Sequence, residues 1–238
     1  MREEPCLTFL NAKPGEKVLD VGCGLGYFLL LLAEKGIECH GIDISEDSVQ
    51  YVHDHITPNV KTGSCFAIPY PDNTFDKVLF CEVIEHVEDD TKALKEIRRV
   101  LKPGGRIVVS TPAYEGWFTR TYLKRLGHQD GGERHVRDGY YKKELAETLK
   151  RSGFCVIGNR FSMFLLSEWI MELTKVVYML RQRSFSAQSD LLNVQKTIPF
   201  RVLNNLLRIL VPLSRLEDRL MTPVFRRGHS HIMAADKC

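Results

Sequence analysis

Apolar and polar positions alternate along most of this chain in a way that favours strands separated by helices. Short apolar runs typical of buried strands occupy residues 17–21, 38–43, 60–63, 75–81, 106–110, 154–159 and 228–234. Helical spacing of apolar residues covers 28–35, 46–55, 91–101 and 140–152. Because strands that alternate with helices form parallel sheets covered by helices, the pattern predicts an α/β fold. A length of 238 residues suits a single domain over 1–238.

A long segment, 161–222, separates the last two expected strands and has apolar stretches of its own. In its first part, Glu168, Glu172 and Lys175 form one narrow stripe on an otherwise apolar helical pattern. These charges argue against a membrane-spanning helix. In its second part, arginines recur every seven residues opposite leucines. We expect a helical insertion within the domain, either a lid over a pocket or a surface that also touches anionic lipid.

Composition and charge narrow the choice of partner. With 44% hydrophobic and 26% charged residues, the chain can bury a sizeable core. The net charge of +3 is uneven: residues 1–180 carry 23 basic and 26 acidic side chains, whereas 181–238 carry 10 and 4. The basic excess lies on amphipathic helical patterns and lacks interleaved aromatic residues. An anionic membrane surface through 161–220 is therefore left open as a partner beside the lid role, and we do not expect a nucleic acid.

The cysteines and the N-terminus point to the cytoplasm. The seven cysteines are scattered and include no C-x-x-C pair, which predicts reduced thiols rather than a disulfide framework. The first residues lack the apolar region of a secretory signal. The expected location is cytoplasmic, with peripheral membrane association left open.

A glycine-rich turn after the first expected strand is the main candidate binding site. Gly22, Gly24 and Gly26 lie between a strand and a helix, where the backbone can approach a ligand closely. Asp43 ends the next strand, where a carboxylate can bind the two hydroxyls of a ribose. The G-x-G-x-G spacing differs from the dinucleotide pattern, and Asp20 suits a cationic group better than a pyrophosphate. A nucleoside-type ligand is predicted.

Five ordered segments resemble the class I S-adenosylmethionine-dependent methyltransferases. They are Val18-Leu-Asp-Val-Gly-Cys-Gly-Leu-Gly26, Gly41-Ile-Asp-Ile-Ser45, Ile68-Pro-Tyr-Pro-Asp-Asn-Thr-Phe-Asp76, Glu85-His-Val87 and Ile97-Arg-Arg-Val-Leu-Lys-Pro-Gly-Gly105. The resemblance covers roughly 15–160 and the last strand. It implies a Rossmann-like seven-stranded sheet of order 3-2-1-4-5-7-6, with strand 7 antiparallel and S-adenosylmethionine as cofactor.

The resemblance also implies which residues bind the cofactor. The glycines would pack on its methionine part near Asp20, Asp43 would bind the ribose, and Ile44 would line the adenine. One departure is Ser64, where the family often has an aspartate that accepts a hydrogen bond from adenine; serine accepts one more weakly. The full set of expected cofactor-binding residues is Asp20, Gly22, Gly24, Gly26, Asp43, Ile44, Ser64, Cys65 and Cys81.

Two carboxylates and a histidine after the fourth expected strand are candidates for catalysis. Glu82, Glu85 and His86 form a Glu-x-x-Glu-His pattern, and His135 lies further along the chain. The pattern is similar to metal-dependent O-methyltransferases of ubiquinone biosynthesis and to small-RNA 2′-O-methyltransferases. That similarity implies a divalent cation such as magnesium, held by Glu82, Glu85, His86 and His135. Alternatively, Glu85 caps a helix and His86 or His135 acts as a general base.

The preferred functional interpretation is methyl transfer from S-adenosylmethionine to a small or amphipathic acceptor, at oxygen. A lipid-like or isoprenoid-like acceptor would account for the apolar insertion. Two alternatives remain open: an RNA 2′-O-methyltransferase, and a non-catalytic protein that binds S-adenosylmethionine as a sensor or assembly factor.

Overall fold

The computed structural model describes residues 3–114, 136–162 and 228–238, with single positions between them at 166, 210, 212–214, 216–217 and 220–221. The insertion expected over 161–222 therefore lies largely outside the described residues, as does His135.

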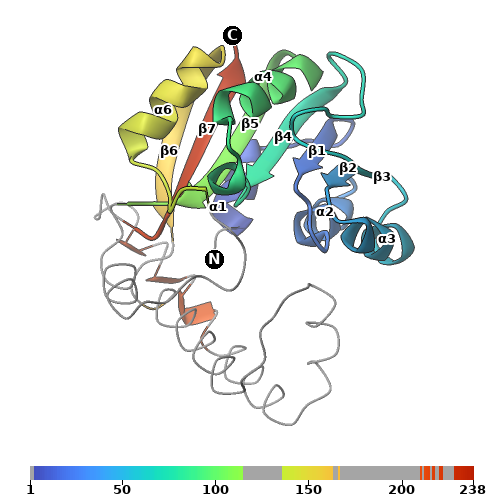
Figure 1. Cartoon of the computed structure of the whole chain (residues 1–238). Coiled ribbons are helices and arrows are strands. Elements are labelled where there is room, and N and C mark those ends of the chain that lie inside the picture. Colours follow the sequence, from blue (N-terminus) through green and yellow to red (C-terminus); the bar gives the residue numbers. More distant parts are fainter. Residues whose placement is uncertain are drawn as a thin grey trace.

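A seven-stranded sheet forms the centre of the described structure (Figure 1). Its strands are β1 (Lys17–Val21), β2 (Glu38–Asp43), β3 (Val60–Thr62), β4 (Phe75–Cys81), β5 (Leu101–Pro112), β6 (Phe154–Ser162) and β7 (Ser230–Lys237). They lie in the order β3-β2-β1-β4-β5-β7-β6. The first five are parallel, and β7 runs antiparallel to β5 and β6. The α/β class, the strand order and the antiparallel strand are all confirmed.

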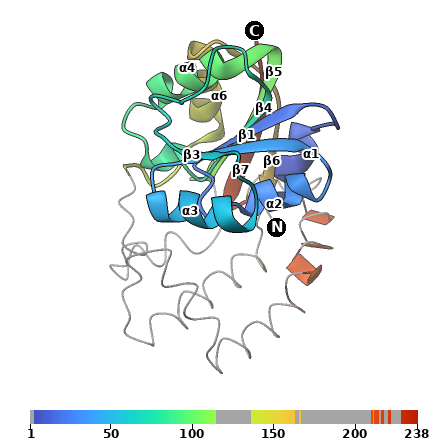
Figure 2. The ribbon, with the colours of Figure 1, turned by 90° about the vertical axis from the view of Figure 1, so that its right-hand side faces the viewer.

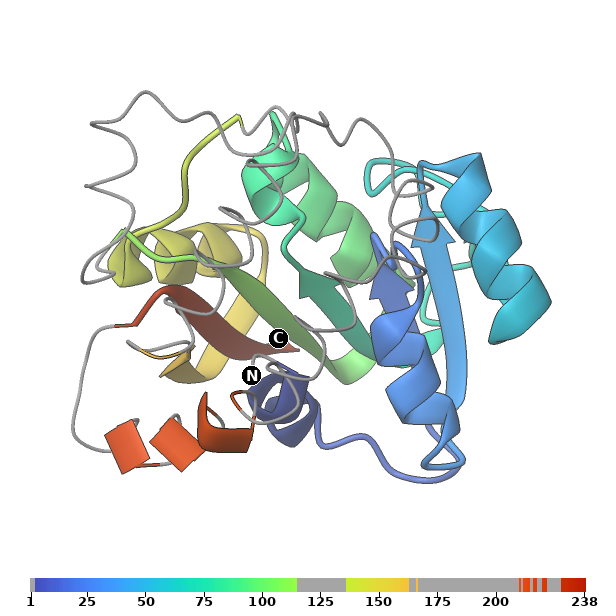
Figure 3. The ribbon, with the colours of Figure 1, turned by 90° about the horizontal axis from the view of Figure 1, so that it is seen from below.

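Helices cover both faces of the sheet (Figures 2 and 3). They are α1 (Glu3–Leu10), α2 (Tyr27–Ala33) and α3 (Glu46–His55) on one face, and α4 (Asp90–Val100) and α6 (Lys142–Arg151) on the other. Each face has its own apolar core, one against α1–α3 and one against α4 and α6. Two of these helices begin at capping residues: at α3, Ser45 accepts from Ser48 N at 3.3 Å, and at α4, Asp89 accepts from Lys92 N at 2.9 Å.

Several boundaries differ from the sequence-based expectation. β5 begins five residues earlier than expected, because Leu101 already pairs with Phe75 of β4. β6 runs on through Ser162, since Phe161 and Ser162 pair with β7. The expected start of the insertion at Phe161 is therefore wrong. None of the helices in the described part of the chain has the length and apolar composition needed to cross a bilayer.

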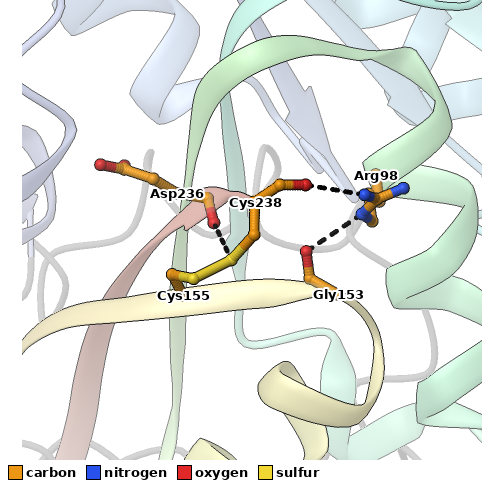
Figure 4. The surroundings of a disulfide bond; sticks show 5 residues. All are labelled: Arg98, Gly153, Cys155, Asp236 and Cys238. Carbon is orange, nitrogen blue, oxygen red and sulfur yellow. Dashed lines mark hydrogen bonds between the residues drawn. A yellow bond between two sulfur atoms is a disulfide. The ribbon is translucent and has the colours of Figure 1, made fainter.

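A disulfide corrects the expectation that all seven cysteines are reduced (Figure 4). Cys155 near the start of β6 is bonded to Cys238, the last residue, with the Cα atoms 5.8 Å apart. Antiparallel pairing of β6 with β7 brings these residues together although 83 positions separate them in sequence. Arg98 of α4 adds hydrogen bonds to the carbonyls of Gly153 (3.0 Å) and Cys238 (2.8 Å). The remaining cysteines are free thiols.

Candidate functional site

The glycine turn after β1 adopts a backbone that only glycine accommodates well. Gly22 and Gly26 both have φ of 77°. A Cβ atom on Gly22 would collide with Val83, and one on Gly26 would come within 2.9 Å of Val52. The turn is fixed to β2, because Gly22 N and Cys23 N donate to the Ile42 carbonyl at 2.8 and 3.0 Å.

Asp43 connects this turn to the end of β2. Its Oδ2 accepts from Gly24 N at 2.7 Å, and its Oδ1 accepts from Ser45 N at 2.9 Å. Charge-assisted hydrogen bonds of this kind are the stronger ones in proteins. The carboxylate is half-buried and each oxygen keeps a further acceptor position. Asp43 therefore stabilises the conformation of the glycine turn, and its carboxylate can still accept hydrogen bonds from a diol.

A cleft of about 250 Å³ opens beside the turn, at the carboxyl ends of β1, β4 and β5. It is lined by Asp20, Gly22, Cys23, Gly24, Tyr27, Phe28, Cys81, Glu82 and Ser110. Open parallel sheets of this kind bind ligands beyond the carboxyl ends of their strands. Sequence reasoning missed Cys23, Tyr27, Phe28 and Ser110, although Ser110 ends the expected strand 106–110.

Asp20 is the most perturbed acid in the cleft. The residue is buried, and its pKa is raised to about 7 by burial and by the nearby Asp43 carboxylate. Such a group is poised to change charge near neutral pH, so a cationic ligand would favour its ionised form.

Glu82 and Glu85 bind hydroxyl groups on neighbouring β5. Ser110 Oγ donates to Glu82 Oε1 at 2.7 Å, and Glu82 itself has a left-handed φ of 56°. Thr111 Oγ1 donates to Glu85 Oε2 at 3.1 Å, where both residues are buried. A left-handed non-glycine residue at a cleft indicates a functional constraint.

The two glutamates do not share a helical face, because only Ile84–His86 forms a short 3-10 helix. Glu85 also does not cap the next helix, since Asp89 does. Half-buried His86 lies in this 3-10 turn directly after β4.

The structure lends no support to the expected divalent cation. Within the described residues, no group of three His, Cys, Asp or Glu side chains could hold a metal ion. His135 is outside them, but the next residue, Val136, donates its N–H to the Glu85 carbonyl at 3.1 Å. Glu85 directly precedes His86 in the sequence, and Val136 directly follows His135. This hydrogen bond therefore joins the two segments that carry the histidines. The magnesium set thus stays a prediction.

The expected adenine side of the site lies where β3 ends. Gly63 N donates to the Asp43 carbonyl at 2.9 Å, which places the end of β3 beside the end of β2. Ile44 is 78% exposed and available for stacking on a ring. Ser64 Oγ already accepts from Phe66 N at 3.2 Å, and Cys65 is half-buried.

Arg99 of α4 holds the loop that follows Ser64. Its guanidinium donates to the carbonyls of Ile68 (3.0 Å) and Tyr70 (2.9 Å) and to Asp72 (2.7 Å). It is also paired with Glu96, whose Oε1 accepts from Ile68 N at 2.9 Å. One arginine therefore fixes three points of the loop.

Comparison with known proteins identifies the family. Residues 19–109 match the family model described as a methyltransferase domain. The chain is also 31% identical over 177 residues to a demethylmenaquinone methyltransferase of Geobacillus sp. (strain WCH70), covering 63% of this chain and 76% of that protein. The chain belongs to the class I S-adenosylmethionine-dependent methyltransferases. S-adenosylmethionine is the cofactor of this family, and the glycine turn and acids of the cleft fit it.

Two further relatives widen the comparison. Phosphoethanolamine N-methyltransferase 1 of Zea mays is 32% identical over 155 residues, which is 61% of this chain and 29% of the maize protein. The matched part of the chain covers about a quarter to a half of the length of several other curated relatives. The solved structure of Haemonchus contortus phosphoethanolamine N-methyltransferase 2 with S-adenosyl-L-methionine aligns with a TM-score of 0.64 at 20% identity, covering 99% of this chain and 52% of that one. At this identity the alignment supports the fold.

Arg99→Met is expected to weaken S-adenosylhomocysteine binding about tenfold, because lost charge-assisted bonds release the loop beside Asp43. Titration calorimetry measures the change. Arg98→Met is the matched control: it lies on the same helix, but its guanidinium binds Gly153 and Cys238 instead. Equal weakening in both variants would mean that Arg99 contributes only to general stability.

Proposed function

We propose that this protein transfers a methyl group from S-adenosylmethionine to a small amphipathic, lipid-like or isoprenoid-like acceptor, at oxygen. The observation that carries the proposal is the cleft itself. It combines the glycine turn with Asp20 and Glu82 at the carboxyl ends of adjacent parallel strands, where this fold places reacting groups.

The chain's own residues account for cofactor binding in this proposal. Gly22, Gly24 and Gly26 allow close backbone approach, while Asp20 and Cys81 line the methionine side. Asp43 accepts the ribose hydroxyls, and the residues on the adenine side are Ile44, Ser64 and Cys65. When bound, the cofactor supplies an electrophilic methyl group on a sulfonium.

His86 is the proposed general base. It follows β4 at the edge of the sheet that holds the cleft. An imidazole near neutral pH can remove a proton from a hydroxyl as the methyl group is transferred. His135 is the second candidate, because the chain beside it is bonded to Glu85.

The names of the relatives suggest acceptors to test. One is named for demethylmenaquinone, an isoprenoid quinone, and another for phosphoethanolamine. The experiment supplies labelled S-adenosylmethionine with an isoprenoid hydroquinone, phosphoethanolamine or a short RNA. We expect labelled product from the hydroquinone. Label only on phosphoethanolamine or RNA would overturn the acceptor class, and bound cofactor without any transfer would support a sensor.

The divalent cation is tested in the same assay. If Glu82, Glu85, His86 and His135 hold magnesium, a chelator stops the transfer and added magnesium restores it. Transfer that continues with chelator and in the Glu82→Gln and Glu85→Gln variants would remove the metal from the proposal.

We further propose that the segment before β7 rests on an anionic membrane surface. Leu213, Leu216 and Leu220 are helical and 49%, 53% and 64% exposed, at the three- and four-residue spacing of one helix face. Flotation with vesicles containing an anionic lipid tests this. Binding should weaken at high salt, and it should fall when Leu216 and Leu220 are replaced by serine. No flotation even at low salt would contradict the membrane role.

Cofactor affinity is expected to rise about tenfold between pH 6 and pH 8 if only ionised Asp20 binds, because its pKa of about 7 sets the ionised fraction. Calorimetry at several pH values measures this affinity, and Asp20→Asn should show a flat profile.

The same raised pKa of Asp20 makes the cofactor-free protein lose stability as pH rises from about 4 to 7, since the folded state keeps a proton that the unfolded chain releases. Thermal unfolding of Asp20→Asn should lack that loss. An unchanged slope would assign the titration to another group.

A further inference from the structure

Two acids on neighbouring strands give the cofactor cleft its charge. Asp20 lies in β1, and Glu82 directly follows the last residue of β4. β1 and β4 pair in parallel, and both acids line the cleft. The described residues that line the cleft include no lysine, arginine or histidine. A positive charge on a ligand is therefore attracted into this cleft.

Asp20 is a buried acid without a hydrogen-bond partner in the part of the chain that the structure describes. The residue is 2% exposed, and no described N–H or O–H group donates to its carboxyl oxygens. Buried carboxylates are normally hydrogen-bonded or paired with a cation. The arrangement leaves this role to a ligand that brings a positive charge or a donor of its own.

Glu82 is held in place by two hydrogen bonds to Ser110 of β5. Its N–H donates to the Ser110 carbonyl at 2.8 Å, and its Oε1 accepts from Ser110 Oγ at 2.7 Å. The Glu82 backbone is left-handed, with φ of 56°. Such a conformation persists only where the surrounding structure imposes it. The Glu82 carboxylate is therefore fixed beside the cleft.

The cleft is small enough for both acids to act on any charge inside it. A volume of about 250 Å³ corresponds to a width of about 8 Å, which is no more than a Debye length at physiological salt. A thiol in the cleft responds to both acids. The pKa of Cys81 is raised well above its usual range, first by the contact with Cys6 and by burial, and further by Asp20 and Glu82.

We propose that Glu82 makes the cleft prefer S-adenosylmethionine over S-adenosylhomocysteine, the product that methyl transfer leaves behind. The preference rests on the proposed function, which places the methionine part near Asp20 and the ribose at Asp43. The two molecules differ only in the methyl group and the positive charge on sulfur, and this sulfur joins the methionine part to the ribose. The charge that distinguishes them therefore lies within the field of Glu82, whereas both share the ammonium group near Asp20.

Weak binding of S-adenosylhomocysteine has a consequence for turnover. A product that binds more tightly than the cofactor stays in the site and inhibits further transfer, whereas this cleft would release it after each reaction. We expect the transfer rate to follow the concentration of S-adenosylmethionine and to change little as S-adenosylhomocysteine accumulates.

Titration calorimetry of the full chain with three ligands tests the preference. They are S-adenosylmethionine, S-adenosylhomocysteine and sinefungin, which carries a protonated amine in place of the sulfonium. The buffer is at pH 8, above the pKa of about 7 of Asp20, and contains a chelator so that no divalent cation screens the acids. We expect the two ligands with the extra positive charge to bind about tenfold more tightly than S-adenosylhomocysteine, a preference that shrinks at high salt.

Glu82→Gln isolates the contribution of charge, because the amide oxygen can still accept from Ser110. This variant should bind S-adenosylmethionine and sinefungin about fivefold more weakly, with S-adenosylhomocysteine within about twofold of wild type. Ser110→Ala keeps the charge of Glu82 but removes one of the bonds that hold it, so its preference should be intermediate. Glu46→Gln, at an exposed acid in the first turn of α3, is the matched control and should keep the full preference.

The outcomes separate this preference from the proposed function. Equal affinities for S-adenosylmethionine and S-adenosylhomocysteine in the wild type would overturn the preference, and so would an unchanged preference in folded Glu82→Gln. If Glu82→Gln does not fold, a full wild-type preference in Ser110→Ala would overturn the role of Glu82. Failure to bind any of the three ligands would overturn both proposals. The expected preference in a protein that methylates none of the three tested acceptors would count against the proposed function alone.

Discussion

Asp43→Ala is expected to weaken S-adenosylmethionine binding by about two orders of magnitude, because it removes charge-assisted bonds worth about 1.5–3 kcal/mol each. Two of these bonds, to Gly24 N and Ser45 N, shape the glycine turn itself. The variant therefore loses both the proposed ribose contact and the geometry of the loop beside it. Titration calorimetry with S-adenosylhomocysteine measures the loss.

Two further variants make this result specific. Asp43→Asn keeps an oxygen that can accept a hydrogen bond but has no charge, so its affinity should fall between those of wild type and Asp43→Ala. Glu46→Ala removes a neighbouring acid in the first turn of α3 and should leave the affinity unchanged. Wild-type affinity in a folded Asp43→Ala protein would show that the nucleoside part binds elsewhere.

The glycine turn and the position of Asp43 at the end of the next strand could be predicted because their constraints are local. A strand, three glycines and an acid lie within 27 residues, from Lys17 to Asp43, and each is required by backbone geometry or by the chemistry of a diol. The structure places these elements side by side, with Gly24 bonded to Asp43. Sequence reasoning works well where neighbours in the chain are also neighbours in space.

The candidate catalytic residues Glu82 and Glu85 depend on contacts with residues distant in the sequence, which explains what was missed. Ser110 binds Glu82 across 28 positions, and the left-handed backbone of Glu82 has no signature in its residue type. Glu82 and Glu85 are positioned by their contacts with β5 and do not share a helical face, since only Ile84–His86 is helical here. α1 was missed as well, since its role appears only when Cys6 and Leu10 pack against the sheet.

Loss of the Cys155–Cys238 disulfide is expected to lower the free energy of unfolding by about 2–4 kcal/mol, because the bond closes a long loop and restricts the unfolded chain. The two cysteines are 83 positions apart, so the loop includes the whole segment between β6 and β7. Urea denaturation of Cys155→Ser/Cys238→Ser and of the wild type measures the difference. The bond also holds the terminal strand end near Arg98, which binds the Cys238 carbonyl.

Reduction provides the decisive comparison for this prediction. Dithiothreitol should lower the urea midpoint of the wild type to that of the double variant and should leave the double variant unchanged. Cys65→Ser is the matched control, because it removes a free thiol and should retain the sensitivity to reductant. Equal midpoints for wild type and double variant without reductant would show that the bond adds no stability. A cytoplasm keeps most thiols reduced, so a midpoint that depends on reductant would make the stability of the β6–β7 edge depend on its redox surroundings.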